Sequence, residues 1–228
     1  MKSVKKSLLY VGVFVWLAST LGPYIVMTLT SITPQEELIS PGARIIPKHP
    51  TLAAFHELLS TTPFLQYLTN SLVTALATVA FSLLVASTAA ISLSRFRFPG
   101  RSSVLTGLLI AQLFPSVLLV IALQSELRKM SLLDSKWGLI LIYTTFSFPF
   151  ATYLLKGFLD SVPRELDEAS RIDGCSTFEM VKYVIFPLLR PGLTAAGTYI
   201  FIYSWNEFLY SLTFTASDSS RTAVSYTH

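Results

Sequence analysis

Charged residues are scarce in this chain. Of its 228 residues, 13% are Asp, Glu, Lys or Arg, whereas 52% are hydrophobic. A soluble domain usually carries about 25% charged residues, so this composition excludes an ordinary soluble domain. The net charge of +4 does not argue for a nucleic-acid partner, because the placement of the basic residues, described below, explains it.

Cysteine and histidine are nearly absent as well. The single Cys175 excludes an internal disulfide and a multi-cysteine metal site. The three histidines, His49, His56 and His228, show no ligand spacing. The chain also lacks the Gly-x-x-x-x-Gly-Lys-Ser/Thr pattern that cradles nucleotide phosphates. We therefore expect no metal, no cofactor and no ATP hydrolysis on this chain.

Long apolar runs with little or no charge dominate instead. Five of them reach about 20 residues, the length needed to cross roughly 30 Å of hydrocarbon. They lie within residues 1–30 and at about 67–94, 102–124, 137–156 and 191–212. A signal peptide is the alternative for the first run, but that run is long and has no clear cleavage site. The sequence predicts an all-α polytopic bundle of five spans in a lipid bilayer.

A proline-rich segment separates the first predicted span from the other four. Residues 31–66 contain five prolines and mixed charge, and predict an exposed connector that is partly helical around 52–59. Residues 67–228 then form one membrane core. Pro23 and Pro115 lie inside apolar runs, where membrane helices tolerate kinks.

The basic residues predict the orientation. With the N-terminus in the cytoplasm, 11 of the 17 Lys and Arg residues lie on the cytoplasmic side and 6 on the other. The positive-inside rule therefore favours a cytoplasmic N-terminus. It also places in the cytoplasm the segment Asp160–Arg190, which holds 10 of the 30 formally charged residues.

The pattern of Asp160–Arg190 predicts two short helices. Ser161 can cap the first helix, with Pro163 in its first turn, and Asp173-Gly174 ends it because glycine tolerates φ > 0. A second helix is expected from Ser176 to about Ile185, opened by a Ser-Thr-Phe-Glu capping box. It should stop before Pro187, since the residue before proline disfavours the α region.

The spacing within this segment resembles a known family motif. The order is Glu168-Ala169-Ser170, three residues, Gly174, nine residues, then Val184-Ile185-Phe186-Pro187. This pattern is similar to the EAA loop of ABC-transporter permease subunits, and Asp173 before the glycine is typical of it. We call Asp160–Arg190 the EAA loop.

Further short motifs are similar to carbohydrate importers of the maltose type. They are Asn70-Ser71, the run from Arg95 to Gly100, Leu133-Asp134-Ser135 and Trp205-Asn206-Glu207-Phe208. The resemblance covers most of residues 8–215.

The resemblance implies a multi-pass permease subunit in a prokaryotic cell membrane. It would work with a second permease subunit, two ATPase subunits that bind the ATP, and an extracytoplasmic solute-binding protein. The implied ATPase-coupling residues are the following: Glu168, Ala169, Ser170, Asp173, Gly174, Phe178 and Pro187. Phe178, Val181 and Met180 could offer an apolar docking face, although Phe178 could equally pack against its own bundle.

The solute path is less clearly marked in the sequence. Candidates are Tyr203, Asn206 and Glu207 in the fifth run, because an ionisable group inside a span usually faces a cavity or a partner. Hydrogen bonding to a neighbouring span is the structural alternative for Asn206 and Glu207, and it is the more common case.

Other classes stay open at this point. A secondary transporter would show internal repeats and broken midplane helices, and no convincing repeat is visible. An importer for an amino acid or phosphate shares the same loop. The chain ends where a sixth family span would be expected, so a truncated end, or a membrane subunit that does not transport, is a further alternative.

Overall fold

The structure of the protein is a computed structural model that describes residues 2–40, 45–217 and 219–227. It contains two compact units, Met1–Phe64 and Leu65–His228. Within the described residues every regular element is a helix, in agreement with the all-α prediction.

The first unit contains the first predicted span and the connector. Its helices are α1 (Lys2–Ser31), α2 (Gln35–Ile39) and α3 (Ala53–Thr61). Helix α1 continues through Pro23, and none of its most apolar stretch is buried, as suits a helix surrounded by lipid. Two connector positions, Pro41 and Arg44, lie outside the described residues.

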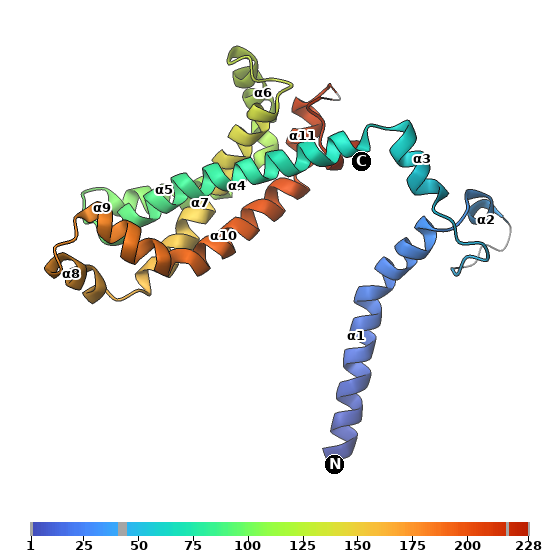
Figure 1. The fold of residues 1–228 in the computed structure, drawn as a ribbon, viewed down its shortest axis with the longest axis horizontal. Helices are drawn as coiled ribbons and strands as arrows, with labels where there is room; N and C mark the ends of the chain where they lie inside the picture. Colours follow the sequence, from blue (N-terminus) through green and yellow to red (C-terminus); the bar gives the residue numbers. More distant parts are fainter. Residues whose placement is uncertain (1, 41–44, 218, 228) are drawn as a thin grey trace. The chain divides into compact units, whose positions relative to one another are not determined.

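The second unit is built around three long helices. Figure 1 shows α7 and α10 alongside α4, with α8 and α9 at one end and α11 at the other. The elements of this unit are α4 (Phe64–Arg95), α5 (Arg101–Leu113), a 3₁₀ turn η1 (Ser116–Leu119), α6 (Val120–Lys129), α7 (Lys136–Asp160), α8 (Glu165–Ile172), α9 (Thr177–Met180), a π turn η2 (Val181–Ile185), α10 (Phe186–Asn206), α11 (Leu209–Phe214) and α12 (Ala223–Thr227).

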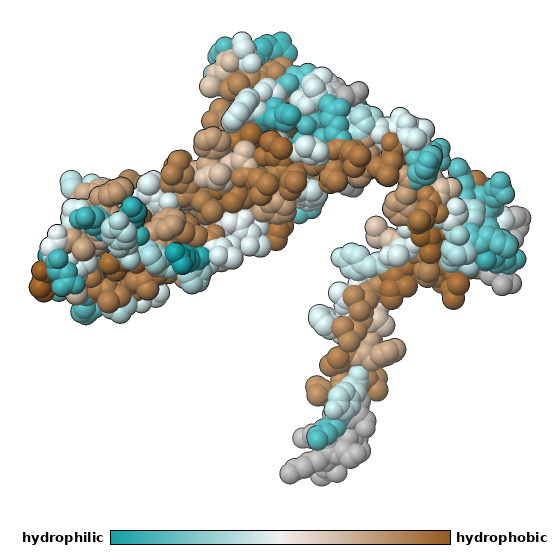
Figure 2. All heavy atoms as spheres, viewed as in Figure 1, coloured by the Kyte–Doolittle hydropathy of each residue, from teal (hydrophilic) through white to brown (hydrophobic). Residues whose placement is uncertain are grey.

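Small side chains allow these three helices to pack closely. Ala86, Ala151 and Ala196, one on each long helix, are fully buried in one apolar cluster. A hydroxyl contact of 2.8 Å joins Ser82 on α4 to Ser147 on α7. Between apolar helices in lipid, close backbone approach and buried hydrogen bonds drive association. The outer surface of the long helices is largely hydrophobic (Figure 2).

The third predicted span is broken. Helices α5 and α6, with the turn η1 between them, are bent by 89° at a short break. Pro115 lies at this break with extended backbone, because it lacks the N–H that would continue the helix and restricts the residue before it. Among the described residues, four helices are long and apolar enough to cross a membrane, and the bent pair would make a fifth.

The last long helix also differs from its predicted extent. We expected a loop up to Arg190 and a span over 191–212, but α10 already begins at Phe186 and ends at Asn206. The chain breaks at Glu207 and starts again as α11 at Leu209. The predicted stop before Pro187 is therefore wrong.

Candidate functional site

The break in the EAA loop has the geometry of a helix stop built on glycine. Helix α8 ends at Ile172, and Gly174 has φ +84°. The N–H of Gly174 donates to the Arg171 carbonyl at 3.1 Å, and the N–H of Cys175 donates to the Ser170 carbonyl at 3.0 Å. These two bonds form a Schellman motif, which needs the left-handed conformation that glycine adopts without a Cβ penalty. The predicted break at Gly174 is confirmed.

The start of the second loop helix also agrees with its sequence signature. Ser176 Oγ accepts from the Glu179 N–H at 3.3 Å, and Glu179 Oε2 accepts from the Ser176 N–H at 2.9 Å. Both halves of the capping box are thus formed. The start of α8 is different, because its N-cap is Arg164 and the Ser161 hydroxyl donates to the Phe158 carbonyl instead. The predicted cap at Ser161 is wrong.

Helix α9 does not end at the proline. It passes into the π turn Val181–Ile185 and then into α10, where Pro187 is one of the first two residues. The N–H of Phe186 donates to the Val181 carbonyl, five residues earlier. This wider turn rearranges the carbonyls that the proline ring would otherwise strike. Thr177 to Asn206 therefore forms one apolar helical stretch of 30 residues.

Several apolar side chains of the loop have no cover in this chain. Ile172 is 86% exposed and Phe178 74% exposed. Leu166 and Tyr183 are exposed as well. Phe178 therefore does not pack against its own bundle. Met180, which we expected on the same outer face, is instead buried in the core.

The residues of the EAA triplet have different surroundings. Ser170 is buried, and its hydroxyl donates to the Asp167 carbonyl at 2.8 Å. Glu168 and Ala169 are exposed. Among the described residues, the carboxylate of Glu168 has neither a hydrogen bond nor an ion pair, whereas its backbone N–H donates to the Arg164 carbonyl at 3.2 Å. The Glu168 carboxylate thus forms no local ion pair.

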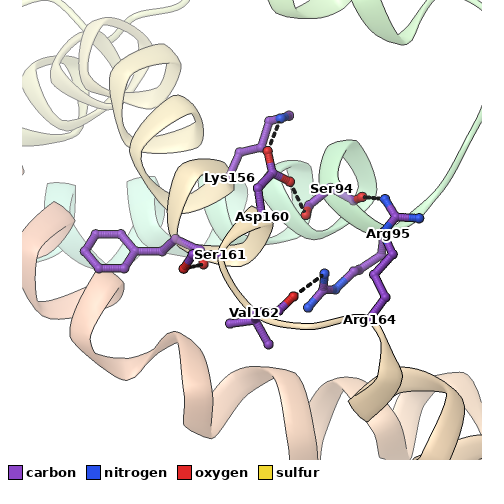
Figure 3. Close-up of polar contacts among 8 residues, drawn as sticks. Ser94, Arg95, Lys156, Asp160, Ser161, Val162 and Arg164 are labelled. Atoms are coloured by element: carbon purple, nitrogen blue, oxygen red, sulfur yellow. Dashed lines mark hydrogen bonds and ion pairs between the residues drawn. The ribbon is translucent and has the colours of Figure 1, made fainter.

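The loop is fastened to the end of α4, which the sequence did not reveal. Arg95 Nε lies 2.9 Å from Asp167 Oδ2, with the two side chains 4% and 14% exposed. Arg95 Nη1 donates to the Val162 carbonyl at 3.3 Å. In return, Arg164 Nη2 donates to the Ser94 carbonyl at 2.8 Å. Figure 3 shows the two arginines side by side.

The side chain of Ser94 adds a third set of contacts to this network. Its hydroxyl donates to Asp160 Oδ1 at 2.6 Å, and Asp160 also pairs with Lys156 one turn earlier. We refer to the contacts of Ser94 and Arg95 with residues 160–167 as the α4 latch. Arg95 belongs to a motif that we singled out in the sequence, but nothing in the sequence identifies Asp167 as its partner.

The candidate path residues separate in the structure. Glu207 Oε2 accepts from the Tyr143 hydroxyl at 3.0 Å and from the N–H groups of Tyr210 and Ser211 at 3.1 and 3.2 Å. Its carboxylate thus satisfies donors at the start of α11 and ties that turn to α7. Asn206 is exposed, and its amide donates to the Ile202 carbonyl within its own helix at 2.8 Å.

Tyr203 is the path candidate that lines a cavity. This cavity has a volume of about 760 Å³ and lies between the broken span, α7 and α10. Phe146, Tyr199 and Tyr203 contribute aromatic rings, and Gln112 and Glu126 contribute polar groups. A concave, mainly apolar site with a few polar groups is typical of small-molecule sites. Sequence reasoning had not identified Glu126.

Two further family-like motifs fasten the segment after α11. Asn70 Nδ2 donates to the carbonyls of Ser219 and Arg221 at 3.1 and 2.9 Å, and Lys136 Nζ donates to Asn70 Oδ1 at 3.2 Å. The neighbouring Ser71 Oγ accepts from a backbone N–H of the same segment at 2.8 Å.

Asp134 holds this segment from the other side. Its Oδ1 accepts from the N–H groups of Ala216 and Ser217 at 2.8 and 3.0 Å and from the Ser220 hydroxyl. Burial raises the pKa of Asp134, but the hydrogen bonds outweigh it and lower that pKa from 3.8 to about 2. The motifs around Asn70 and Asp134 thus have a structural role.

Comparisons with known proteins agree with this architecture. Residues 82–225 match the family described as binding-protein-dependent transport system inner membrane component. The chain is 34% identical over 217 residues to the sulfoquinovosyl glycerol transport system permease protein SmoH of Agrobacterium fabrum, which covers 95% of this chain and 76% of that protein. It is 38% identical over 200 residues to the galactooligosaccharides transport system permease protein GanQ of Bacillus subtilis, which covers 86% and 68%.

A solved structure shares the fold. The crystal structure of a bacterial ABC transporter involved in the import of the acidic polysaccharide alginate matches with a TM-score of 0.87 and 21% identity, over 98% of this chain and 79% of that chain. The described helices, the family match and these relatives together identify a multi-pass membrane permease component and not an enzyme. The chain belongs to the family of binding-protein-dependent transport system inner membrane components.

Proposed function

We propose that this chain is the permease subunit of an ATP-driven, binding-protein-dependent importer for a carbohydrate. The names of SmoH and GanQ both specify transport of sugar-containing solutes, which supports the substrate class. The observation that carries the coupling role is the EAA loop: two helices, divided at Gly174, that expose Phe178 without any cover in this chain.

The proposed partners follow from the family and from the surface of the loop. A second permease subunit completes the path, two ATPase subunits bind ATP, and an extracytoplasmic protein delivers the solute. The charge distribution puts the loop in the cytoplasm, where an ATPase subunit can reach it. Phe178 then enters an apolar cleft on the ATPase subunit, and the unpaired Glu168 faces a basic group there.

The proposed coupling step is mechanical. Closure of the ATPase pair displaces α9. Because Thr177–Asn206 is one helical stretch, the displacement tilts α10 together with α9 and does not dissipate in a flexible joint. In this role Asp173 and Gly174 form the break that sets the angle between α8 and α9. The buried Ser170 keeps α8 thin where it packs, and the exposed Ala169 keeps the outer face beside Glu168 small. Pro187 favours the π turn that joins the two helices.

The proposed solute path includes the aromatic cavity. Tyr203 and Tyr199 present rings on which the apolar face of a sugar can stack, and Gln112 offers amide groups for its hydroxyls. Asn206 is exposed at the end of α10, where it can reach a passing solute. Glu207 contributes by fixing the turn into α11, because its carboxylate is already occupied by three donors.

Co-purification tests the coupling role. The chain is expressed with its partner permease and ATPase subunit, extracted in detergent, and assayed for retained ATPase. We expect Phe178→Asp to lose the ATPase subunit. Ile46→Asp is the matched control, since Ile46 is 72% exposed but lies in the connector. Retention by Phe178→Asp, or loss by both variants, would contradict the proposed docking.

Uptake in proteoliposomes tests the substrate class. With the cognate binding protein present, labelled oligosaccharides should be taken up in an ATP-dependent manner, and unlabelled sugars should compete where amino acids and phosphate do not. Competition by amino acids or phosphate alone would refute the carbohydrate assignment while leaving the coupling role intact.

A further inference from the structure

We infer that the α4 latch transmits the movement of the EAA loop to α4, with Arg95 and Asp167 as the positioning residues. This inference rests on the proposed function, because it concerns how the force applied to the loop is distributed. In the simple arrangement the loop moves only the helices that flank it in sequence, α7 and α10. The latch adds α4, which precedes the loop by about 65 residues.

The central contact is an ion pair shielded from solvent. Arg95 Nε and Asp167 Oδ2 are 2.9 Å apart, and neither side chain is more than 14% exposed. Exposed ion pairs are readily exchanged for water contacts and hold segments together only weakly. Separating a buried pair leaves an unpaired charge in a poorly solvated place, which is far more costly. Helix α8 therefore cannot move away from α4 without a large penalty.

The remaining contacts hold the two segments in both directions. Arg95 donates from α4 to a loop carbonyl, that of Val162, and Arg164 donates from the loop to an α4 carbonyl, that of Ser94. The Ser94 hydroxyl adds a bond to Asp160. Because donors and acceptors alternate between the segments, neither sliding nor lifting of the loop leaves the network intact. Residues 160–167 of the loop and the end of α4 should move as one body.

Helix α4 connects the EAA loop to a segment near the opposite end of the bundle. Helix α4 has 32 residues, which at about 1.5 Å per residue is about 48 Å of rigid rod. Near its other end, Asn70 holds the carbonyls of Ser219 and Arg221. A displacement of the EAA loop is thus passed along α4 to the segment that follows α11, independently of α10.

Fluorescence of a single label on α4 tests the inference. Cys175→Ser removes the native thiol, and Ser92→Cys places a bimane on the exposed side of the last turn of α4. The permease pair is reconstituted with a hydrolysis-deficient ATPase subunit, and the emission is recorded before and after ATP. We expect ATP to shift the emission in the parent, and Arg95→Gln and Asp167→Asn each to reduce this shift about five- to tenfold.

Double-mutant analysis separates the pair from its surroundings. The double variant should lose no more of the response than Arg95→Gln alone, because Asp167 acts through Arg95, whereas Arg95 also holds the Val162 carbonyl. Arg95→Lys keeps the charge but has fewer donors, so its emission shift should lie between those of the parent and Arg95→Gln. In the hydrolysing complex, sugar transported per ATP should fall in parallel. Glu57→Gln removes an exposed charge in the connector and should leave every readout unchanged.

The outcomes distinguish the inference from the proposed function. Loss of the ATPase subunit from the parent chain would refute the proposed function and the inference with it. Retained ATPase with an unchanged label response in both single variants would overturn only the latch. Loss of ATPase from variants that melt at the parent temperature would assign the pair to docking and would also overturn it. Independent, additive losses in the double variant would do the same.

Discussion

Replacement of Gly174 by alanine isolates the backbone conformation of the EAA loop. Gly174 has φ +84°, and a Cβ built there would meet no atom within 4 Å. Sterically, therefore, only the left-handed backbone is penalised, by about 1–2 kcal/mol for an L-residue. Part of this is offset because alanine restricts the unfolded chain. A net cost of about 1 kcal/mol remains, which corresponds to about fivefold in an equilibrium constant.

The assay is titration of the ATPase subunit onto the permease pair in nanodiscs. Gly174→Ala should let the free loop relax out of the docking conformation and so weaken the ATPase affinity by up to about fivefold. Gly174→Asn should weaken it less, because asparagine tolerates the left-handed region. Gly174→Val should be worse than either, since its branched Cβ restricts the backbone further.

Gly100 supplies the matched control for this prediction. It also has φ +84° with no atom within 4 Å of a built Cβ, but it precedes α5 and lies outside the EAA loop. Gly100→Ala should carry the same backbone penalty and leave the ATPase affinity unchanged. Unchanged affinity in Gly174→Ala, or equal weakening by both variants, would refute the reasoning that the break at Gly174 positions the docking helix.

Three further predictions concern the elements around the site. Ser176→Ala removes the capping box and should cost about 1 kcal/mol of helix stability, seen as faster backbone amide exchange in α9. Gly192→Ala places a Cβ 2.9 Å from Phe158 Cγ and should lower the free energy of unfolding by about 1–3 kcal/mol. In Gly197→Ala the nearest atom is 3.4 Å from the new Cβ, so this variant should be neutral or slightly stabilised in thermal melts. Asp134 has a folded-state pKa of about 2, below its ordinary 3.8, so the stability it contributes is present above about pH 4 and lost as the pH falls towards 2. The melting temperature should fall in that window, and Asp134→Asn should remove that part of the fall. A variant whose melting temperature keeps the parent's pH profile would contradict the assignment.

Local patterns in the sequence predicted the local structure well. The glycine break and the capping box each depend on residues within about four positions of one another, and an apolar run depends only on contiguous residues. The local sequence therefore specifies them. Gly174 and Ser176 therefore adopt the expected geometry. The same reasoning failed at Pro187, because a π turn, which depends on how the whole helix packs, compensates for the missing N–H.

Contacts between distant segments were beyond the reach of sequence reasoning. Arg95 and Asp167 are separated by 72 positions in the chain, and nothing in either local pattern selects the other. Glu207 illustrates the same limit. As the only charge in its apolar run it suggested a place in the solute path, yet its oxygens are occupied by Tyr143 and by two backbone donors of α11.

The arrangement of these distant contacts explains how the loop can pass a displacement on to the helix bundle. A segment joined to its bundle by flexible linkers would absorb displacement in the linkers. Here the α9 side continues into α10 as a helix, and the α8 side is held to α4 by a shielded ion pair. The break between these two attached sides lies at Gly174, between α8 and α9, and this is where their angle can change. A force applied near Phe178 must therefore change the angle between α4 and α10, and the cavity lined by Tyr199 and Tyr203 of α10 should change its shape with that angle.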